Sequence, residues 1–137
     1  MVVALTYAAK RGVDVKIIMP HIPDKKYAFI LARTFYNELV DAGVEIYEFL
    51  PGFVHSKVFV SDDEKAVVGS INMDFRSMYL SFECAALLYQ NKEILNIEAD
   101  FQNTLKECEK VTKDVYQNQP VWQKLAGSLL RLFAPLM

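Results

Sequence analysis

Three observations predict an α/β fold with a mixed β-sheet and helices on its faces. In the first half of the chain, segments with a helical apolar repeat alternate with short β-branched runs. In the second half, apolar runs follow one another with turn residues between them, so some neighbouring strands should pair antiparallel. The length is 137 residues, with 53% hydrophobic and 23% charged residues, which suits one folded domain and excludes a disordered chain. We therefore interpret residues 1–137 as a single domain.

The first half of the chain predicts alternating helices and strands. Gly12 and Gly43 suit the ends of two helices, and Asp24 is a suitable N-cap for the second. Apolar residues from Ala28 to Ala42 recur on one face of that second helix. The predicted elements are a helix at 1–11, a strand at 13–18, a long helix at 24–42 and a strand at 44–49.

The second half predicts a cluster of strands followed by two helices. Pro51–Gly52 and Asp62–Glu64 are typical of turns. The run from Leu80 to Tyr89 is almost entirely apolar, so we expect it to be a largely buried strand. The predicted elements are strands at 55–60, 66–69 and 80–89, a helix from about 91 to 108, and a last helix at 120–134.

Composition limits the classes of function. The net charge of −2 argues against a protein held to nucleic acid by bulk positive charge, so no nucleic-acid partner is expected. Cys84 and Cys108 lack the spacing of a zinc site, and we expect them to be reduced core thiols. The longest uncharged runs have about nine residues, whereas a membrane span needs about 20. No signal peptide is expected.

One stretch carries a specific motif, which can be written H-x-K-x4-D-x6-G-S-x-N. Its fixed positions are His55, Lys57, Asp62, Gly69, Ser70 and Asn72. Six fixed positions occur by chance with a frequency of about 10⁻⁸ per starting residue, if each residue type has a frequency of roughly 1 in 20. Chance therefore does not explain the pattern, although His55 and Lys57 alone would also fit an ordinary surface strand.

The residue types in this motif suit a phosphate site. Residues i and i+2 of a strand face the same side, so His55 and Lys57 should project together, as should Ser70 and Asn72. Their imidazole, ammonium, hydroxyl and amide groups can surround one phosphate. Glu83, a carboxylate within the apolar run, would need a strong partner if buried, and the His55 ring is the obvious one. The alternative for Glu83 is a carboxylate that reaches solvent from a sheet edge.

This motif resembles the name-giving His–Lys–Asp motif of the phospholipase D superfamily. Further segments resemble the C-terminal half of bacterial cardiolipin synthases, and the match covers nearly the whole chain. Ser81 departs from the family pattern, which has Asn there. The resembling segments are Arg11–Val15, Ala42–Glu48, Pro51–His55, Asp74–Ser77 with Glu83, Trp122–Leu125 and Pro135–Met137.

The resemblance implies a phospholipase D-like half-domain whose first strand and second catalytic motif are missing, as in a piece of a longer chain. It implies phosphatidyl transfer between two phosphatidylglycerol molecules through a phosphohistidine, without a metal or other cofactor. His55, Lys57, Asp62 and Glu83 would be catalytic, with Asp62 more a structural brace than a proton carrier. Ser70 and Asn72 would bind the phosphate.

The implied partners are the phospholipid, the N-terminal half of the same enzyme and the membrane surface. The site of action would be the cytoplasmic face of the cell membrane, with this chain itself soluble, and a homodimer is possible. The alternatives are a homodimeric nuclease or phosphodiesterase of the superfamily, which the net charge of −2 disfavours, and a non-catalytic packing module.

Three further features of the sequence each allow two interpretations. His21 lies between two prolines and is expected to be a loop residue, with a second catalytic histidine as the weaker reading. Arg76 and Ser77 suit either a turn or a substrate contact. In the last helix, one face is apolar and could dock on protein or lie on a membrane surface; it comprises Trp122, Leu125, Leu129, Leu132 or Phe133, and Leu136.

Overall fold

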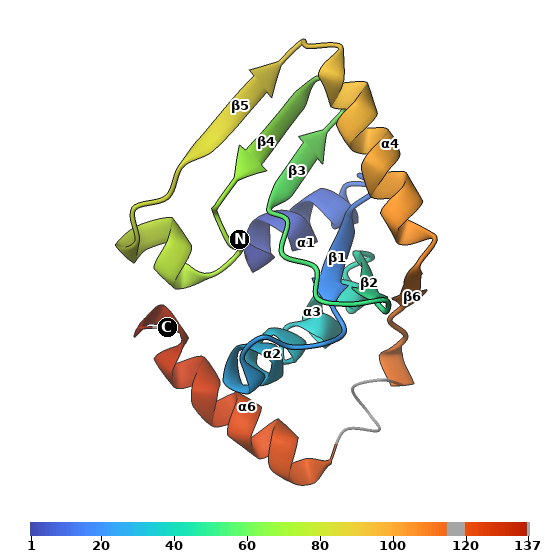
Figure 1. Ribbon diagram of the computed structural model, residues 1–137. Coiled ribbons are helices and arrows are strands. Elements are labelled where there is room, and N and C mark those ends of the chain that lie inside the picture. The colour runs from blue at the N-terminus through green and yellow to red at the C-terminus, as the bar shows by residue number, and fades with distance from the viewer. Residues whose placement is uncertain (115–119, 137) are drawn as a thin grey trace.

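The computed structural model describes residues 1–114 and 120–136, and its α/β class and mixed sheet are as predicted (Figure 1). The mixed sheet has the strand order β1-β2-β6. Strands β1 (Lys16–Pro20) and β2 (Glu45–Phe49) are parallel, and β6 (Cys108–Lys110) pairs antiparallel with β2. The sequence did not predict β6, because its three residues are too few for a periodic pattern, and Cys108 was assigned to the preceding helix.

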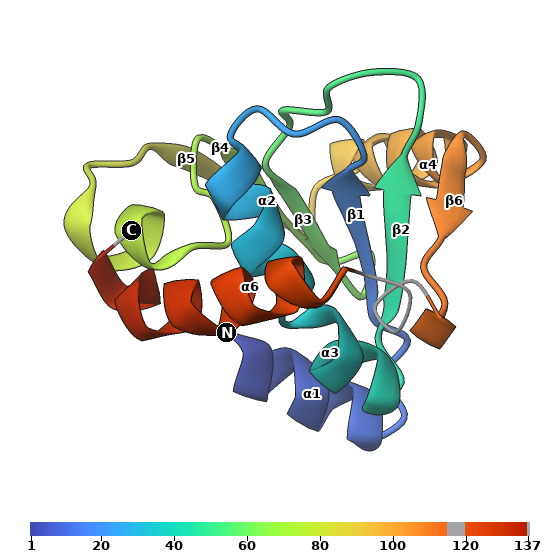
Figure 2. The same cartoon turned by 90° about the horizontal axis from the view of Figure 1, so that it is seen from below.

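The other three strands form a second sheet, which is antiparallel throughout. Its strands are β3 (Val58–Ser61), β4 (Lys65–Gly69) and β5 (Ala85–Tyr89), in the order β3-β4-β5. The expected mixed sheet therefore holds only half of the described strands. Figure 2 shows the two sheets with helices around them.

Helices cover the first sheet and join it to the second. The core contains Tyr36, Leu39, Val44, Ile46 and Val111, against which Val2, Leu5 and Ala9 of the first helix pack. Helix α4 contacts strands of both sheets. The helices are α1 (Val2–Lys10), α2 (Lys26–Arg33), α3 (Tyr36–Asp41), α4 (Glu93–Leu105) and α6 (Val121–Phe133), with short helices η1 (Arg76–Leu80) and η2 (Ala134–Leu136).

The prediction of one long helix at 24–42 is wrong in one respect, because the structure has two helices there, α2 and α3. At the break, Thr34 Oγ1 donates a hydrogen bond to the Leu31 carbonyl at 2.6 Å, and the backbone N–H of Thr34 bonds the same carbonyl. Such local bonds compete with the regular helical pattern. The N-cap of α2 is Lys25, one residue beyond the predicted Asp24, and no side-chain cap bond forms.

The strands predicted at 55–60 and 80–89 are shorter than expected. His55 and Lys57 precede β3, and Glu83 precedes β5, with η1 occupying the start of the second run. That run is also not buried: Phe82 is fully exposed and Leu87 is 71% exposed. Strand β5 contacts mainly β4, so a run that is apolar in sequence remains a surface.

Helix α6 docks on α2 through the face opposite its predicted apolar stripe. A Cβ on Gly127 would lie 2.5 Å from Thr34 Cγ2, so only glycine permits this close approach. Arg131 stacks over the Phe35 ring at 4.2 Å and pairs with Glu38 at 3.2 Å. The predicted stripe, Trp122, Leu125, Leu129, Leu132 and Phe133, is exposed; the side chain of its last predicted member, Leu136, lies outside the described part. Among the described residues, no helix is both long and apolar enough to cross a bilayer.

Adjacent residues of α4 provide a stability test of this packing. Ile94 is fully buried, whereas Leu95 is 59% exposed. We predict that Ile94→Ala lowers the free energy of unfolding by about 2–5 kcal/mol, because it leaves a cavity between the helix and the sheets. The control Leu95→Ala should cost less than about 1 kcal/mol. Urea denaturation of the chain measures both, and equal losses would contradict the observed helix orientation.

Candidate active site

The structure brings five predicted site residues together around one open pocket. The pocket has a volume of about 370 Å³ and opens beside the ends of the second sheet. No aromatic or aliphatic side chain lines it, so its described walls are polar apart from one glycine. The lining residues are His55, Lys57, Gly69, Ser70, Asn72 and Glu83.

Backbone pairing of the second sheet assembles this pocket. The Gly69 N–H donates to the Lys57 carbonyl at 3.1 Å, and the Ser70 N–H donates to the Cys84 carbonyl at 3.0 Å. Gly69 is opposite Ala85, and a Cβ on Gly69 would come within 2.6 Å of the Ala85 Cα. The motif glycine is therefore required for the close approach of β4 and β5, which carries Ser70 to Glu83.

Among the described residues, Glu83 forms no hydrogen bond with the His55 ring, which corrects the expected pairing. Instead, Ser70 Oγ donates a hydrogen bond to Glu83 Oε2. The Ser70 oxygen in turn accepts from the Cys84 N–H at 3.1 Å. Hydrogen bonds from Ser70 and then Ser77, with the charge of Lys57, hold the pKa of Glu83 below its ordinary value. Glu83 is therefore a solvent-accessible carboxylate that remains ionised in the neutral range.

The imidazole and the ammonium group of the motif reach the pocket from a segment without regular structure. The His55 ring lies 5.4 Å from the Phe53 ring, centroid to centroid, and is exposed. Lys57 Nζ donates to the His55 carbonyl at 2.6 Å. The expectation that both residues face one side is confirmed by the pocket, but the reason given for it, a strand at 55–57, is wrong.

A second serine supports the site, and sequence reasoning did not separate its role from that of a turn residue. Asn72 Nδ2 donates to Ser77 Oγ at 3.2 Å, and the Ser77 N–H donates to Asp74 Oδ1 at 2.7 Å. Ser77 is buried in η1, next to the exposed Arg76. Because Ser77 also lowers the pKa of Glu83, it links the amide and the carboxylate of the pocket. Its place in the segment Asp74–Ser77, which resembles the family sequence, was the available signal.

Asp62 and the cysteines lie apart from this pocket. Asp62 is in the β3–β4 turn with φ 54°, where Ser61 Oγ donates to it at 3.0 Å. Figure 1 shows that this turn is at the far end of β3 from the pocket segment, so Asp62 can act only through the fold. Cys84 is exposed, contrary to the expected core position, and Cys108 is half-buried. In the described ranges, no three His, Cys, Asp or Glu side chains form a metal cluster.

The geometry defines a class of chemistry. An imidazole, an ammonium and an amide around an accessible pocket can bind a phosphate oxyanion, and an imidazole can act on its phosphorus as a nucleophile or pass protons. Glu83 is the one carboxylate among the residues that line the pocket, so the pocket can still bind an anion. The pocket therefore has the donor groups that suit binding of a phosphoester.

Comparisons with known proteins narrow this class to a family. The family model described as "Cardiolipin synthase, PLD-like domain" matches residues 1–105. The chain is 42% identical over 134 residues to a cardiolipin synthase of Geobacillus sp. and 40% identical over 134 residues to cardiolipin synthase 2 of Bacillus anthracis. It is 56% identical to an uncharacterized protein of Streptococcus mutans. The chain belongs to the phospholipase D-like domain family of cardiolipin synthases, as the sequence motif indicated.

The matches also define how much of those relatives the chain represents. They cover 98% of this chain but only 29%, 27% and 26% of the Streptococcus, Geobacillus and Bacillus relatives, respectively. A crystal structure of a phospholipase D family member, Nuc from Salmonella typhimurium, is similar in fold, with a TM-score of 0.73 at 22% identity. That similarity covers 82% of this chain and 73% of the Nuc chain. The chain spans little more than a quarter of its curated relatives.

The Ser70–Glu83 bond gives a prediction about pH. Hydrogen bonding to the ionised form lowers the pKa of Glu83, so the stabilisation is present while Glu83 is charged and is lost as the pH falls through that pKa. We predict that Ser70→Ala raises the pKa of Glu83 towards its ordinary value. The carboxyl ¹³C shift of Glu83, followed by NMR titration, measures it. Ser81→Ala, which removes a nearby hydroxyl with no described bond to Glu83, is the control, and an unmoved pKa in the Ser70 variant would contradict the bond.

Proposed function

We propose that this chain supplies one half of an active site that transfers a phosphatidyl group from one phosphatidylglycerol to another. The products are cardiolipin and glycerol. The observation that carries the proposal is the convergence of His55, Lys57 and Asn72 on one open polar pocket, within the family motif. The relatives that are named cardiolipin synthase support this class of reaction.

The reaction would proceed in two displacements at phosphorus. An imidazole nitrogen attacks the first phosphatidylglycerol, forming a P–N bond while the P–O bond to the glycerol headgroup breaks. A second imidazole gives its proton to the departing glycerol oxygen. That imidazole then removes the proton from a headgroup hydroxyl of the second phosphatidylglycerol, whose oxygen attacks phosphorus and releases the first imidazole. His55 supplies one of these two imidazoles, and the other half of the enzyme supplies its counterpart.

The remaining pocket residues have distinct proposed roles. Lys57 and Asn72 stabilise negative charge on the non-bridging phosphate oxygens. Ser70 shares its hydroxyl between Glu83 and the Cys84 backbone, so it orders the pocket wall as well as facing the phosphate. Glu83 acts on His55 through the local field of the shared pocket, since its direct bond is to Ser70. Asp62 braces the β3–β4 turn.

Exposed apolar surface supports the proposal that this is one half of the site. The edge strand β5 exposes Leu87 (71%) and Tyr89 (58%), and η1 beside the pocket exposes Tyr79 (80%). Large exposed apolar patches are typical of interaction surfaces, and an unpaired strand edge is a ready docking element. We assign this surface to the N-terminal half of the full-length enzyme, which would add the second wall of the pocket.

The substrate places the proposed enzyme at a membrane surface. Phosphatidylglycerol is held in the bilayer, so we propose action at the cytoplasmic face of the cell membrane. The stripe of α6 that faces away from α2 exposes Trp122, Leu125, Leu129 and Leu132, which fits contact with lipid or with the missing half. Dimerisation of the chain could substitute for that half, as in the alternative of a homodimeric phosphodiesterase.

The role of His55 is testable in the full-length enzyme. We predict that His55→Ala lowers phosphatidyl transfer by about 10³-fold or more, because a bond-making or proton-transferring group is lost and not only a contact. Thin-layer analysis of cardiolipin formed from labelled phosphatidylglycerol measures the rate. Ser56→Ala, at the exposed position beside it, is the control and should stay near wild type. Activity above a tenth of wild type in the histidine variant would refute the assignment.

The half-site proposal predicts that the isolated chain is inactive as a monomer. One motif gives one catalytic imidazole, and the reaction needs two on opposite sides of phosphorus. Sedimentation combined with the phosphatidylglycerol assay measures the state and the turnover of the same sample. Turnover by a verified monomer would exclude the half-site. A rate that rises with the square of protein concentration would favour a face-to-face homodimer over the unlike partner.

A further inference from the structure

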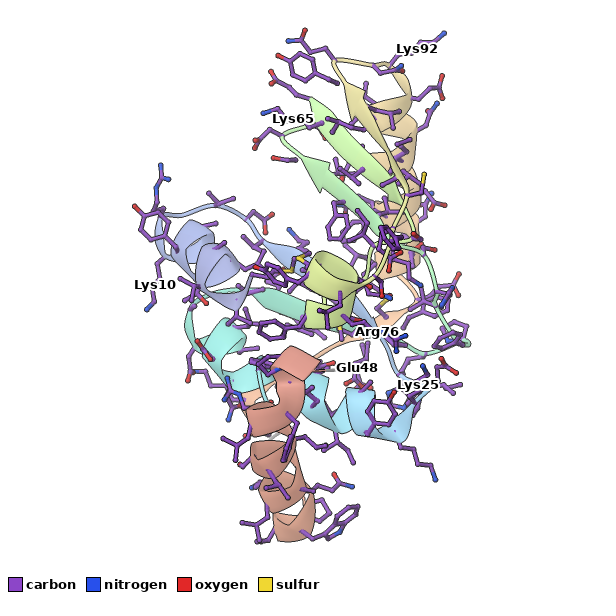
Figure 3. The ribbon with its side chains drawn as sticks, turned by 90° about the vertical axis from the view of Figure 1, so that its left-hand side faces the viewer. Lys10, Lys25, Glu48, Lys65, Arg76 and Lys92 are labelled. Carbon is purple, nitrogen blue, oxygen red and sulfur yellow. The ribbon has the colours of Figure 1, made fainter. Side chains whose placement is uncertain are left out.

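A buried carboxylate outside the active-site pocket is bound by two basic side chains. Glu48 on β2 is 5% exposed. Arg33 at the end of α2 donates to both of its oxygens, through Nη2 at 2.8 and 2.9 Å and Nε at 3.2 Å. His21, in the loop after β1, places Nδ1 2.8 Å from Glu48 Oε2. Figure 3 shows Glu48 within the body of the molecule, while Lys65 and Lys92 mark the far end of the second sheet.

These contacts fix Glu48 in one position. A buried charge is tolerated only when it is paired and hydrogen-bonded, and removal of one partner is costly. Arg33 is itself held, because its guanidinium lies 4.4 Å over the Phe29 ring. Burial, together with the Glu48 charge, raises the pKa of the neighbouring Tyr36, which therefore stays neutral beside the pair. Arg33 already balances the charge of Glu48, so His21 adds a contact that charge balance does not require.

The place of that contact in the chain connects it to the active site. His21 bonds two consecutive residues at the end of β2. Its ring is hydrogen-bonded to the Glu48 carboxylate, and its backbone N–H donates to the Phe49 carbonyl at 3.2 Å. The segment 50–57 follows without helix or strand and carries His55 and Lys57. At its other end, the Lys57 carbonyl accepts from Gly69. Figure 2 shows that the loops after β1 and β2 leave the first sheet at the same end.

The segment is therefore held at both ends. Upstream, His21 bonds Glu48 and Phe49, and the Leu50 N–H donates to the Glu107 carbonyl at 3.4 Å. We propose that His21 is a positioning residue for His55: its side chain, through Glu48, helps to fix where the segment 50–57 leaves β2, beside a backbone bond to Phe49 that substitution of the side chain leaves in place. The proposal rests on the proposed function only for its kinetic readout. A displacement of about 1 Å in a reacting group can lower a rate by about 10²-fold, so a remote attachment can matter for turnover.

Two substitutions at position 21 separate positioning from other roles, in the full-length enzyme. Asn carries an amide N–H near the place of His Nδ1 but has no second ring nitrogen. We expect His21→Ala to lower kcat for phosphatidyl transfer about ten- to a hundredfold, with KM changed less than about threefold. His21→Asn should restore kcat to within about threefold of wild type. Thermal unfolding of each variant checks that the fold is kept.

A structural readout accompanies the kinetics and does not require catalysis. Tryptic cleavage after Lys57 under native conditions reports how firmly the segment 50–57 is held. Cleavage should be faster in His21→Ala than in wild type and in His21→Asn. Wild-type kcat and cleavage in the alanine variant would overturn the proposal. Equal loss of kcat in both variants would also overturn it, in favour of direct proton transfer by His21.

The same set of measurements distinguishes failure of the proposed function from failure of this inference. If the wild-type enzyme forms no cardiolipin, the proposed function fails, and the cleavage comparison still decides whether His21 holds the segment. If transfer occurs and depends on His55 but not on the His21 side chain, the inference alone fails.

Discussion

The register of the three antiparallel strands β3, β4 and β5 is the constraint on which the site depends. The pocket residues come from three separate points in the sequence, and only strand pairing makes them neighbours. Gly69 bonds Lys57 on one side and opposes Ala85 on the other, so one residue sets both alignments. A slip of a single residue would turn every side chain of the slipped strand to the other face of the sheet and separate Ser70 from Glu83.

The sequence predicted those parts of the molecule that local patterns determine. Helical and strand periods gave the α/β class, and the fixed spacing from His55 to Asn72 gave the pocket. What it did not predict depends on groups distant in sequence. The run around Phe82 was expected to be buried because it is apolar, but burial requires a covering element, and none is described there. The partner of Glu83 was missed because it also depends on a residue distant in sequence. A strand was assumed at Glu83, where the chain is irregular, and the carboxylate bonds Ser70.

The exposure pattern is consistent with a site that is open on one side. The described pocket is lined only by polar groups and a glycine, while exposed apolar side chains lie on η1 and along the edge strand β5. Electrostatic stabilisation of a phosphorane-like state is much stronger when water is excluded. Under the proposed function, this chain positions the polar groups, and exclusion of water from the pocket falls to the partner half.

The charge distribution separates this site from one that binds a polyanion. The chain carries a net charge of −2, yet its pocket combines Lys57 and His55 with a single carboxylate. A polyanion binder gains affinity from many phosphate contacts, each of which releases counterions, and it needs an extended basic face. A single phosphodiester needs only the local donors. Hydrogen bonds from Ser70 and Ser77 stabilise the ionised form of Glu83. The carboxylate can therefore stay charged beside a bound phosphate, because these donors offset part of its repulsion of the phosphate. The arrangement therefore suits a single phosphodiester at a membrane surface better than a polyanion with many phosphate groups.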